Sequence, residues 1–281
     1  MTTLENKIVL ITGATAGIGK ETALALAKQK AHLLLPVRNM EKGRALQAEI
    51  AQKTGHRLVN LLECDLASLA SVARMAAEVQ SKYQRLDILI NNAGVWEPQR
   101  KYSQDKIELT WAVNHLAPFL LTNLLLPMLK QSAPARIINV ASDLHQGEIQ
   151  FDDPEFKKSY ELRGLPAYRQ SKLANILFTR ALAKRLEGSG VTANCLMPGF
   201  IASDLFRDMN FLMRGLISLV AKSPRQGAAT TVHLATSDEV AQVSGEYFKD
   251  KKRASSSHQS KDMQSAERLW ELSMEYVKNF M

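Results

Sequence analysis

The sequence is poor in cysteine, with only Cys64 and Cys195 among its 281 residues. Both lie in stretches that we expect to be strands, which favours two buried thiols over a disulfide framework. The six histidines show no ligand spacing, so no metal site is predicted. Disulfide-stabilised secreted domains and zinc modules are therefore excluded as classes.

Long hydrophobic runs are also missing, since no stretch of about 18 uninterrupted apolar residues occurs. The opening "MTTLENKIVL" has no basic start followed by an apolar core and a cleavage site. We expect a soluble, cytoplasmic protein with no membrane span.

Aromatic residues are few, at 6%, although the net charge is +8 and the pI is near 9.4. The basic residues are spread out and are not interleaved with aromatics, which argues against nucleic acid as a partner. The one local basic run, "KDKKR" at 249–253, is predicted to be a solvated loop.

What the chain does have is an alternation of short apolar runs with stretches of helical length. Seven runs are predicted as strands: "KIVLIT", "AHLLLPV", "RLVNLLE", "LDILIN", "ARIINVA", "VTANCLM" and "SGEYF". The early runs are apolar on both faces, which indicates a parallel sheet covered by helices on both sides. The predicted fold is a doubly wound α/β fold of the Rossmann type with a seven-stranded parallel sheet.

Helices are predicted at 17–30, 40–54, 68–84, 106–131, 166–187 and 225–236. A polar link and a C-terminal docking helix are expected over 249–281, because Ala266, Leu269, Trp270, Ser273, Val277 and Phe280 share one helical face. No repeat or composition shift divides residues 1–281, so one dinucleotide-binding domain is expected.

Three glycines crowd the stretch "LITGATAGIGKETA", between the first strand and the first helix. Gly13 allows a tight turn, Gly17 lets the backbone approach a phosphate, and Gly19 lets the helix pack closely on the strand. The unpaired N–H groups at a helix start suit a pyrophosphate. An ordinary strand-to-helix turn is the alternative reading.

Further motifs follow in a fixed order, namely "TGATAGIG" at 12–19, "CDL" at 64–66, "NNAG" at 91–94, Asn114, Ser142, "YRQSK" at 168–172 and "PG" at 198–199. In order and spacing the chain resembles the short-chain dehydrogenase/reductase family over residues 5–248. It is most similar to the retinol-dehydrogenase-like branch, through "TGATAGIGKETA", the "NH" at 114–115, "LWELS" at 269–273 and the long interval between Ser142 and Tyr168.

The pattern Tyr-x-x-x-Lys occurs three times, at Tyr102/Lys106, Tyr168/Lys172 and Tyr247/Lys251. Only the second opens an apolar helix, where a spacing of four stacks both side chains on one face. We expect the ammonium of Lys172 to lower the pKa of Tyr168 and so make it a general acid or base.

Two more residues complete the predicted catalytic set. Ser142 ends a strand at the carboxyl edge of the sheet, where its hydroxyl can bond the reacting oxygen, unless it only caps a turn. The resemblance assigns Asn114 to a water-linked proton relay through Lys172, and Lys172 also to the nicotinamide ribose. Asn114 alternatively satisfies helix backbone.

The coenzyme set follows largely from the resemblance, which places Asp65 at the adenine and Ser203 with the "PG" pair at the carboxamide. Arg38 ends the second strand, where NAD enzymes usually carry an acid, so NADP(H) is expected to be preferred, with NAD(H) possible. The full set is Gly13, Thr15, Gly17, Ile18, Gly19, Arg38, Asp65, Leu66, Asn92, Ala93, Gly94, Tyr168, Lys172, Pro198, Gly199 and Ser203.

A lipophilic substrate is expected because residues 200–222, after the sixth strand, carry more large apolar side chains than an exposed connector should. This stretch is predicted to form a lid that contributes Leu205 and Phe206. Leu144, His145 and Phe151 are predicted to wall the pocket from the interval before Tyr168. A subunit contact in a homo-oligomer is the alternative for the same apolar residues.

These features together predict an NADP(H)-dependent oxidoreductase that interconverts a carbonyl compound and an alcohol. The main alternative is a non-catalytic dinucleotide sensor that binds a partner protein. A methyltransferase on a related sheet is the other, although it would not need the serine, tyrosine and lysine.

Overall fold

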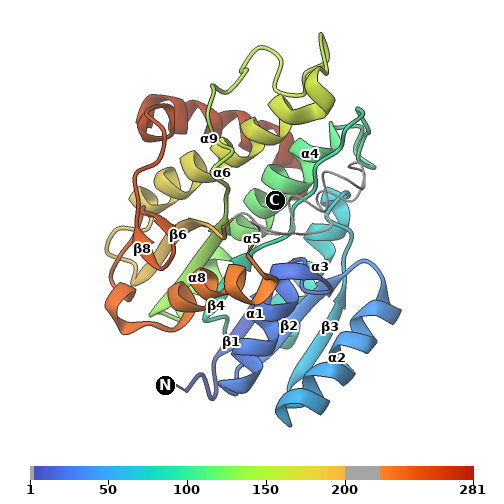
Figure 1. The fold of residues 1–281 in the computed structure, drawn as a ribbon, viewed down its shortest axis with the longest axis vertical. Helices are drawn as coiled ribbons and strands as arrows, with labels where there is room; N and C mark the ends of the chain where they lie inside the picture. Colours follow the sequence, from blue (N-terminus) through green and yellow to red (C-terminus); the bar gives the residue numbers. More distant parts are fainter. Residues whose placement is uncertain (1–2, 200–221) are drawn as a thin grey trace.

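An eight-stranded sheet runs through the described part of the chain, residues 3–199 and 222–281 of a computed structural model (Figure 1). In spatial order the strands are β3 (Val59–Glu63), β2 (His32–Val37), β1 (Ile8–Ile11), β4 (Ile88–Asn91), β5 (Ala135–Val140), β6 (Val191–Met197), β7 (Tyr247–Lys249) and β8 (Lys252–Arg253). Neighbouring strands from β3 to β7 are parallel, and β8 pairs with β7 in the antiparallel sense.

The strand β8 corrects the prediction of a seven-stranded, wholly parallel sheet. Asp250 and Lys251, which join β7 to β8, both have positive φ, 50° and 65°. Two such residues form the tight turn that suits a two-residue hairpin. The segment predicted to be a solvated loop therefore folds back as an edge strand. Its turn residues, "DK", do not signal a hairpin in the sequence as "NG" or "DG" would.

Helices cover both faces of the sheet (Figure 1). One face carries α1 (Gly17–Lys28), α2 (Met40–Thr54) and α8 (Pro224–Thr236). The other carries α3 (Leu69–Lys82), α4 (Leu109–Trp111), α5 (Ala117–Gln131), α6 (Leu165–Arg185) and α9 (Met263–Val277). The doubly wound α/β fold predicted from the sequence is confirmed.

Two cores result, one on each side of the sheet. Successive strand residues alternate between them: Val9 and Ile11 belong to the core under α1, α2 and α8, whereas Leu10 between them belongs to the core under α3, α5 and α6. Burial on both faces explains why the strands are continuous apolar runs.

Local capping sets the helix ends. Asn39 Oδ1 accepts a hydrogen bond from Lys42 N at 2.9 Å at the start of α2, and Gly55, with φ of 73°, ends it. The helix predicted at 106–131 begins instead at Leu109, because the Glu108 carboxylate accepts bonds from Thr110 N and Trp111 N. It is then interrupted by a π-helical turn, Ala112–Leu116, which no sequence pattern predicted.

The apolar helical stretch Leu109–Gln131 is long enough to cross a membrane, with a mean hydropathy of 1.4. In the fold, 78% of its most apolar part is buried. Leu116, Phe119 and Leu120 lie in the core beneath the sheet. The apolar composition of this stretch is therefore explained by its burial as a core helix.

The C-terminal segment, defined as residues 254–280, folds back along α6. In α9 the side chains of Ala266, Leu269 and Val277 are buried, and Arg185 of α6 stacks over the Trp270 ring at 4.0 Å. The serine-rich stretch before α9 is also folded, because Ser260 Oγ contacts Ser256 Oγ at 2.6 Å inside the protein.

Replacing Leu269 with alanine tests whether α9 is part of the cooperative domain. Leu269 is 1% exposed, so Leu269→Ala is expected to lower the free energy of unfolding by about 2–5 kcal/mol in a single urea transition. Leu58→Ala, at a side chain that is 58% exposed, serves as the control and should change it by less than about 0.5 kcal/mol. Equal stability of the two variants would mean that α9 is not integral to the fold.

Candidate active site

The candidate active site lies where the sheet order reverses, between β1 and β4. Side chains join the loops that follow these strands. Thr12 Oγ1 accepts hydrogen bonds from Asn92 N at 3.0 Å and from Ala93 N at 3.1 Å, and Asn92 Nδ2 donates to Thr12 O at 2.8 Å. In open α/β sheets a crevice forms at such a switch point, at the carboxyl ends of the strands.

Two of the three loop glycines are required by close contacts. A Cβ on Gly13 would lie 2.8 Å from Ala93 Cα, and one on Gly19 would lie 2.2 Å from Gly13 O. Gly13 also has φ of 68°, which disfavours other residues. These glycines hold the loop, α1 and the end of β4 together.

Gly17 differs, because no described atom lies within 4 Å of the place where its Cβ would be. It is the first residue of α1, and Ala16 before it makes no side-chain cap. A side chain at residue 17 would therefore extend into open space beside the first turn of α1, whose N–H groups have no partner within the helix. The geometry fits a phosphate group of a dinucleotide.

The other residues predicted at the coenzyme lie at the same edge. Thr15 and Ile18 flank Gly17, the exposed Arg38 follows β2, Asp65 and Leu66 follow β3, and Pro198 and Gly199 follow β6. The Asp65 carboxylate accepts from Ala67 N at 3.0 Å and from Gln104 Nε2 at 3.2 Å. Ser203, Leu205 and Phe206 lie outside the described residues, as does the predicted lid up to residue 221.

Tyr168, in the first turns of α6, lies beside the side chain of Ser142, which follows the end of β5. Tyr168 is only 5% exposed, and burial raises the pKa of its hydroxyl to about 12, against the opposing effect of the nearby Ser142 hydroxyl. The prediction that Lys172 lowers the pKa of Tyr168 is therefore wrong. Lys172 Nζ lies 5.6 Å from the centre of the Tyr168 ring and donates to Val140 O at 3.1 Å.

Lys172 is itself buried, and burial lowers its pKa to about 8. It faces Gly94, where a Cβ would lie 3.2 Å from Lys172 Nζ and 3.5 Å from Asn114 Oδ1. Gly94, Asn114 and Lys172 thus meet at one point, and a side chain at residue 94 would separate them.

Asn114 lies in the π-helical turn and is fully buried. Its Oδ1 accepts from Val95 N at 2.7 Å, and its Nδ2 donates to Val95 O at 2.8 Å and to Ser171 Oγ at 3.0 Å. In the described chain its amide is therefore engaged with Val95 and Ser171 rather than with Lys172. A π-turn at this place is typical of functional sites.

The two other Tyr-x-x-x-Lys pairs have different surroundings. Tyr102 is 54% exposed, and Tyr247 donates to the Asp143 carboxylate at 2.8 Å. Tyr168 is the tyrosine of the three whose hydroxyl lies beside Ser142.

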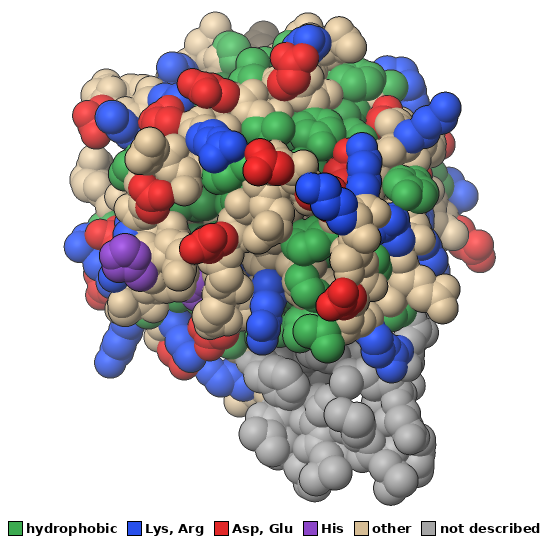
Figure 2. All heavy atoms as spheres, turned by 90° about the horizontal axis from the view of Figure 1, so that it is seen from above, with side chains coloured by type: hydrophobic (Ala, Val, Ile, Leu, Met, Phe, Trp, Pro, Cys, Tyr) green, Lys and Arg blue, Asp and Glu red, His purple; other side chains and the backbone are tan. Residues whose placement is uncertain are grey.

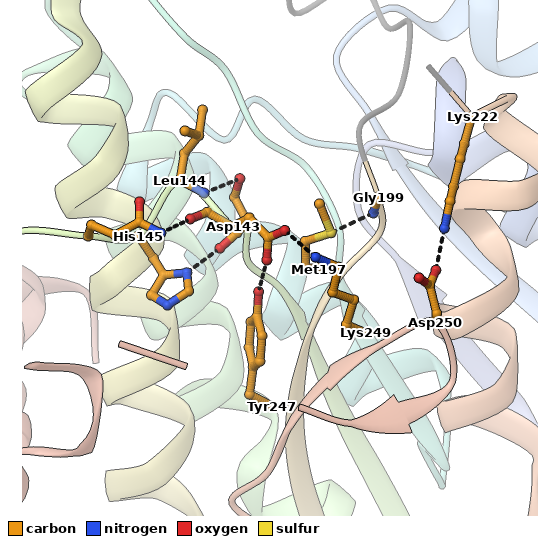
Figure 3. A network of polar contacts seen from close by, with 11 residues as sticks. Asp143, Leu144, His145, Met197, Gly199, Lys222, Tyr247, Lys249 and Asp250 are labelled. Carbon is orange, nitrogen blue, oxygen red and sulfur yellow. Dashed lines mark hydrogen bonds and ion pairs between the residues drawn. The ribbon is translucent and has the colours of Figure 1, made fainter. Parts of the chain in front are cut away.

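The residues after Ser142, which we name the serine loop (142–145), are held from several sides (Figure 3). Leu144 N donates to Ser142 Oγ at 3.0 Å, and Asp143 accepts from Tyr247 and from Lys249 Nζ. The ring of His145 reaches Ser142 O at 2.6 Å through Nδ1 and Ser257 N at 3.0 Å through Nε2. Leu144 and His145, both predicted to wall the pocket, extend in opposite directions from the loop (Figure 3).

Phe151, the third predicted wall residue, packs under the guanidinium of Arg268 at 4.1 Å. It lines a hollow of about 810 Å³ between the 148–159 stretch, α6 and the residues before α9. This hollow is lined by none of the four predicted catalytic residues.

Trp96 is a site residue that the sequence reading missed. Its ring stacks on that of Tyr168, with centroids 5.3 Å apart and planes at 22°, and its Nε1 donates to Arg163 O at 2.8 Å. Its place two residues after "NNAG", at the carboxyl end of β4, is the signal that was available.

Within residues 3–199 and 222–281, no group of three or more His, Cys, Asp or Glu side chains is placed to hold a metal ion. Cys64 and Cys195 are free, buried thiols.

Comparison with known proteins gives consistent results. The chain is 42% identical to retinol dehydrogenase 13 of Homo sapiens over 278 residues, which covers 95% of this chain and 83% of that protein. It is 43% identical to human retinol dehydrogenase 12, over 98% and 87% of the two chains. The RhlG/NADP active-site complex of Pseudomonas aeruginosa superposes with a TM-score of 0.73 and 27% identity, over 88% of this chain and 95% of that one.

A family model described as short chain dehydrogenase matches residues 7–211. Together with the site geometry and the relatives above, this match identifies the protein family. The chain belongs to the short-chain dehydrogenase family, in its retinol-dehydrogenase-like branch, and is an oxidoreductase that acts on CH–OH groups.

Proposed function

We propose that this enzyme transfers hydride between NADP(H) and a lipophilic carbonyl compound or alcohol, with Tyr168 as the acid or base. The observation that carries the proposal is the placement of the buried Tyr168 side chain beside Ser142, with Lys172 Nζ 5.6 Å from its ring centre at the point where Gly94, Asn114 and Lys172 meet. The coenzyme supplies the hydride when bound, and the protein has to orient the substrate and move one proton.

Ser142 and Tyr168 hold the reacting oxygen in this proposal. Two hydroxyls that lie side by side can both donate to a carbonyl oxygen placed between them, which polarises the C=O bond. Because burial raises the pKa of Tyr168 to about 12, its hydroxyl is protonated at neutral pH. This supports proton donation from Tyr168 Oη to the carbonyl oxygen, the step that reduction requires.

Lys172 is suited to replace that proton. Its pKa, lowered to about 8 by burial, lets the ammonium exchange a proton near neutral pH, as a relay requires. Asn114 and Gly94 fix the space in front of Lys172 Nζ. We propose that Asn114 orders the water through which Lys172 is reprotonated, as the family resemblance implies.

Replacing Tyr168 with phenylalanine removes the proton donor but keeps the ring that stacks on Trp96. Turnover in aldehyde reduction is expected to fall by about 10²–10⁴, the range for loss of a general acid, while NADPH affinity measured by fluorescence titration stays near that of the wild type. The matched control is Tyr102→Phe, an exposed member of another Tyr-x-x-x-Lys pair. A Tyr168→Phe enzyme as active as this control would remove Tyr168 from the mechanism.

The preference for NADP(H) rests on Arg38. This exposed guanidinium follows β2, at the sheet edge that carries the glycine loop, where it can pair with a ribose 2′-phosphate. The similarity to a structure solved as an NADP complex supports the proposal. NAD(H) remains a possible second coenzyme.

Substitution of Arg38 by alanine should selectively weaken use of NADPH. Because a charge-assisted bond to phosphate contributes about 1.5–3 kcal/mol, kcat/KM for NADPH is expected to fall by about tenfold to a hundredfold with little change for NADH. Arg57→Ala, at an exposed site before β3, controls for loss of a positive charge. Equal kcat/KM for the two coenzymes in the wild type would contradict the proposal at once.

The lipophilic substrate is proposed from three features. The apolar face of Trp96 lies against Tyr168. Residues 200–217 carry Phe200, Leu205, Phe206, Phe211, Leu212, Leu216 and Ile217. The named relatives are retinol dehydrogenases, and retinol is a lipophilic alcohol. A lid over 200–222 remains a proposal drawn from the sequence.

A series of straight-chain aldehydes of increasing length tests this proposal. Burial of each added methylene contributes up to about 0.8 kcal/mol, so kcat/KM is expected to rise by up to about fourfold per methylene until the pocket is full. Aldehydes of the same length with a terminal hydroxyl are the control and should show a weaker trend. Equal efficiency along the apolar series would rule out a lipophilic pocket.

A cytoplasmic location is also proposed. The two buried, free thiols suit a reducing compartment, and the long apolar helical stretch is used in the core.

A further inference from the structure

Two buried histidines connect the predicted catalytic residues to the far end of the chain. His115 follows Asn114 directly, and His145 ends the serine loop that begins at Ser142. Each histidine contacts a serine of the C-terminal segment: His115 contacts Ser273 and His145 contacts Ser257. These contacts span 158 and 112 residues of sequence.

The hydrogen-bond directions at His145 can be assigned. Ser257 N can only donate, so His145 Nε2 accepts and carries no proton. The proton of the neutral ring is then on Nδ1, which donates to Ser142 O at 2.6 Å. The ring thereby joins the backbone of Ser257 to the backbone of Ser142.

At His115 the ring donates to the C-terminal segment, whereas the His145 ring accepts from it. The hydroxyl of Ser273 donates its one proton to Leu269 O at 2.7 Å, so it accepts from His115 Nε2 at 2.8 Å. The His115 ring is fully buried, 4.6 Å from the Trp111 ring centre and near Phe119 and Phe178. An apolar side chain would pack in such surroundings without the free-energy cost of removing a polar imidazole from water.

What these bonds hold is the geometry of the site. His115 lies in the same π-helical turn as Asn114, whose amide bonds Val95 next to Gly94. A shift of His115 therefore moves Asn114 and the end of β4 that faces Lys172. A shift of His145 moves the carbonyl of Ser142, whose hydroxyl lies beside that of Tyr168.

We propose that the C-terminal segment is a positioning element of the active site, acting through His145 on Ser142 and through His115 on Asn114. His145, predicted from the sequence to touch the substrate, becomes a positioning residue in this assignment. The inference rests on the proposed function, because it concerns the placement of that function's catalytic groups.

Substitutions that keep or remove one bond at a time test the proposal. In His115→Gln the amide Nε2 replaces the ring Nε2 as the donor to Ser273, and His115→Leu removes it. In His145→Asn the amide Nδ2 replaces the ring Nδ1 as the donor to Ser142 O, and His145→Leu removes it. Glu267→Gln is the control, because Glu267 pairs with Arg185 and holds α9 on α6 without touching either histidine.

The two leucine variants are expected to lower kcat for aldehyde reduction by about tenfold to a hundredfold, as small misplacements of catalytic groups do. NADPH affinity should change less than kcat, because these hydrogen bonds of the two histidines go to Ser142, Ser257 and Ser273 and not to the glycine loop. The glutamine and asparagine variants should recover most of kcat. Glu267→Gln should lower the melting temperature and leave kcat unchanged.

The proposal is overturned if the leucine variants keep wild-type kcat, or if kcat follows melting temperature alike in all five variants. If His115→Leu does not fold, Ser273→Ala, which removes only the hydroxyl that accepts from His115, takes its place and is expected to lower kcat in the same range. Ser265→Ala, on the exposed start of α9, is its control.

Failure of the proposed function is distinguishable from failure of this inference. A wild-type enzyme without turnover on any aldehyde or alcohol defeats the proposed function. Crystal structures of Ser273→Ala and His145→Leu then decide the positioning role without turnover. A displaced Asn114 amide in the first and a displaced Ser142 hydroxyl in the second support it, and unchanged positions overturn it.

Discussion

The site depends on one constraint, which is the close approach of the β1 turn to the end of β4. Thr12 and Asn92 bond these loops to each other, and the contacts of Gly13 and Gly19 leave no room for a side chain between them. Because β1 to β6 are parallel, every loop that follows a strand emerges at this same edge. The open space at Gly17 and the meeting of Gly94 with Lys172 both lie beside that approach.

Burial of the Lys172 ammonium opposes folding. Lys172 is 3% exposed, and its pKa is lowered to about 8 from an ordinary value near 10.5. The unfolded chain therefore binds this proton more tightly than the folded one, so the destabilisation is complete below about pH 8 and disappears as the pH rises towards 10.5. The protein tolerates this penalty because the surrounding core is large, as is common at active sites.

The sequence was sufficient for the features that local chemistry determines. Apolar runs predicted the seven parallel strands, and the capping residues Asn39 and Ser223 mark helix starts that match the expected ranges. Family spacing singled out Ser142, Tyr168, Lys172 and Asn114, whose catalytic roles remain predictions. The hairpin at Asp250 and the π-turn at Asn114 were missed, because backbone conformations that depend on tertiary contacts leave no period in the sequence.

The other features that the sequence did not predict depend on residues that are far apart in the chain. Trp96 donates its hydrogen bond to a residue 67 positions away, and the Ser273 contact of His115 spans 158 positions. Such pairs are set by how α6 and α9 pack, which no single stretch encodes. The expected effect of Lys172 on Tyr168 failed for a related reason: helical spacing placed the two side chains on one face, but the direction of Lys172 Nζ towards Val140 O is a tertiary outcome.

The same packing gives the positioning histidines and the predicted proton-transfer residues different pKa values. Burial lowers the pKa of His115 to about 3 and also lowers that of His145, so both rings stay neutral near pH 7 and their hydrogen-bond directions do not change. Burial raises the pKa of Tyr168 to about 12, which keeps its proton in place until a substrate accepts it. Lys172, at about 8, is then the group of these four whose protonation changes near neutral pH. The hydrogen bonds that hold Ser142 and the turn of Asn114 therefore do not change with pH near neutrality, whereas the protonation of Lys172 does.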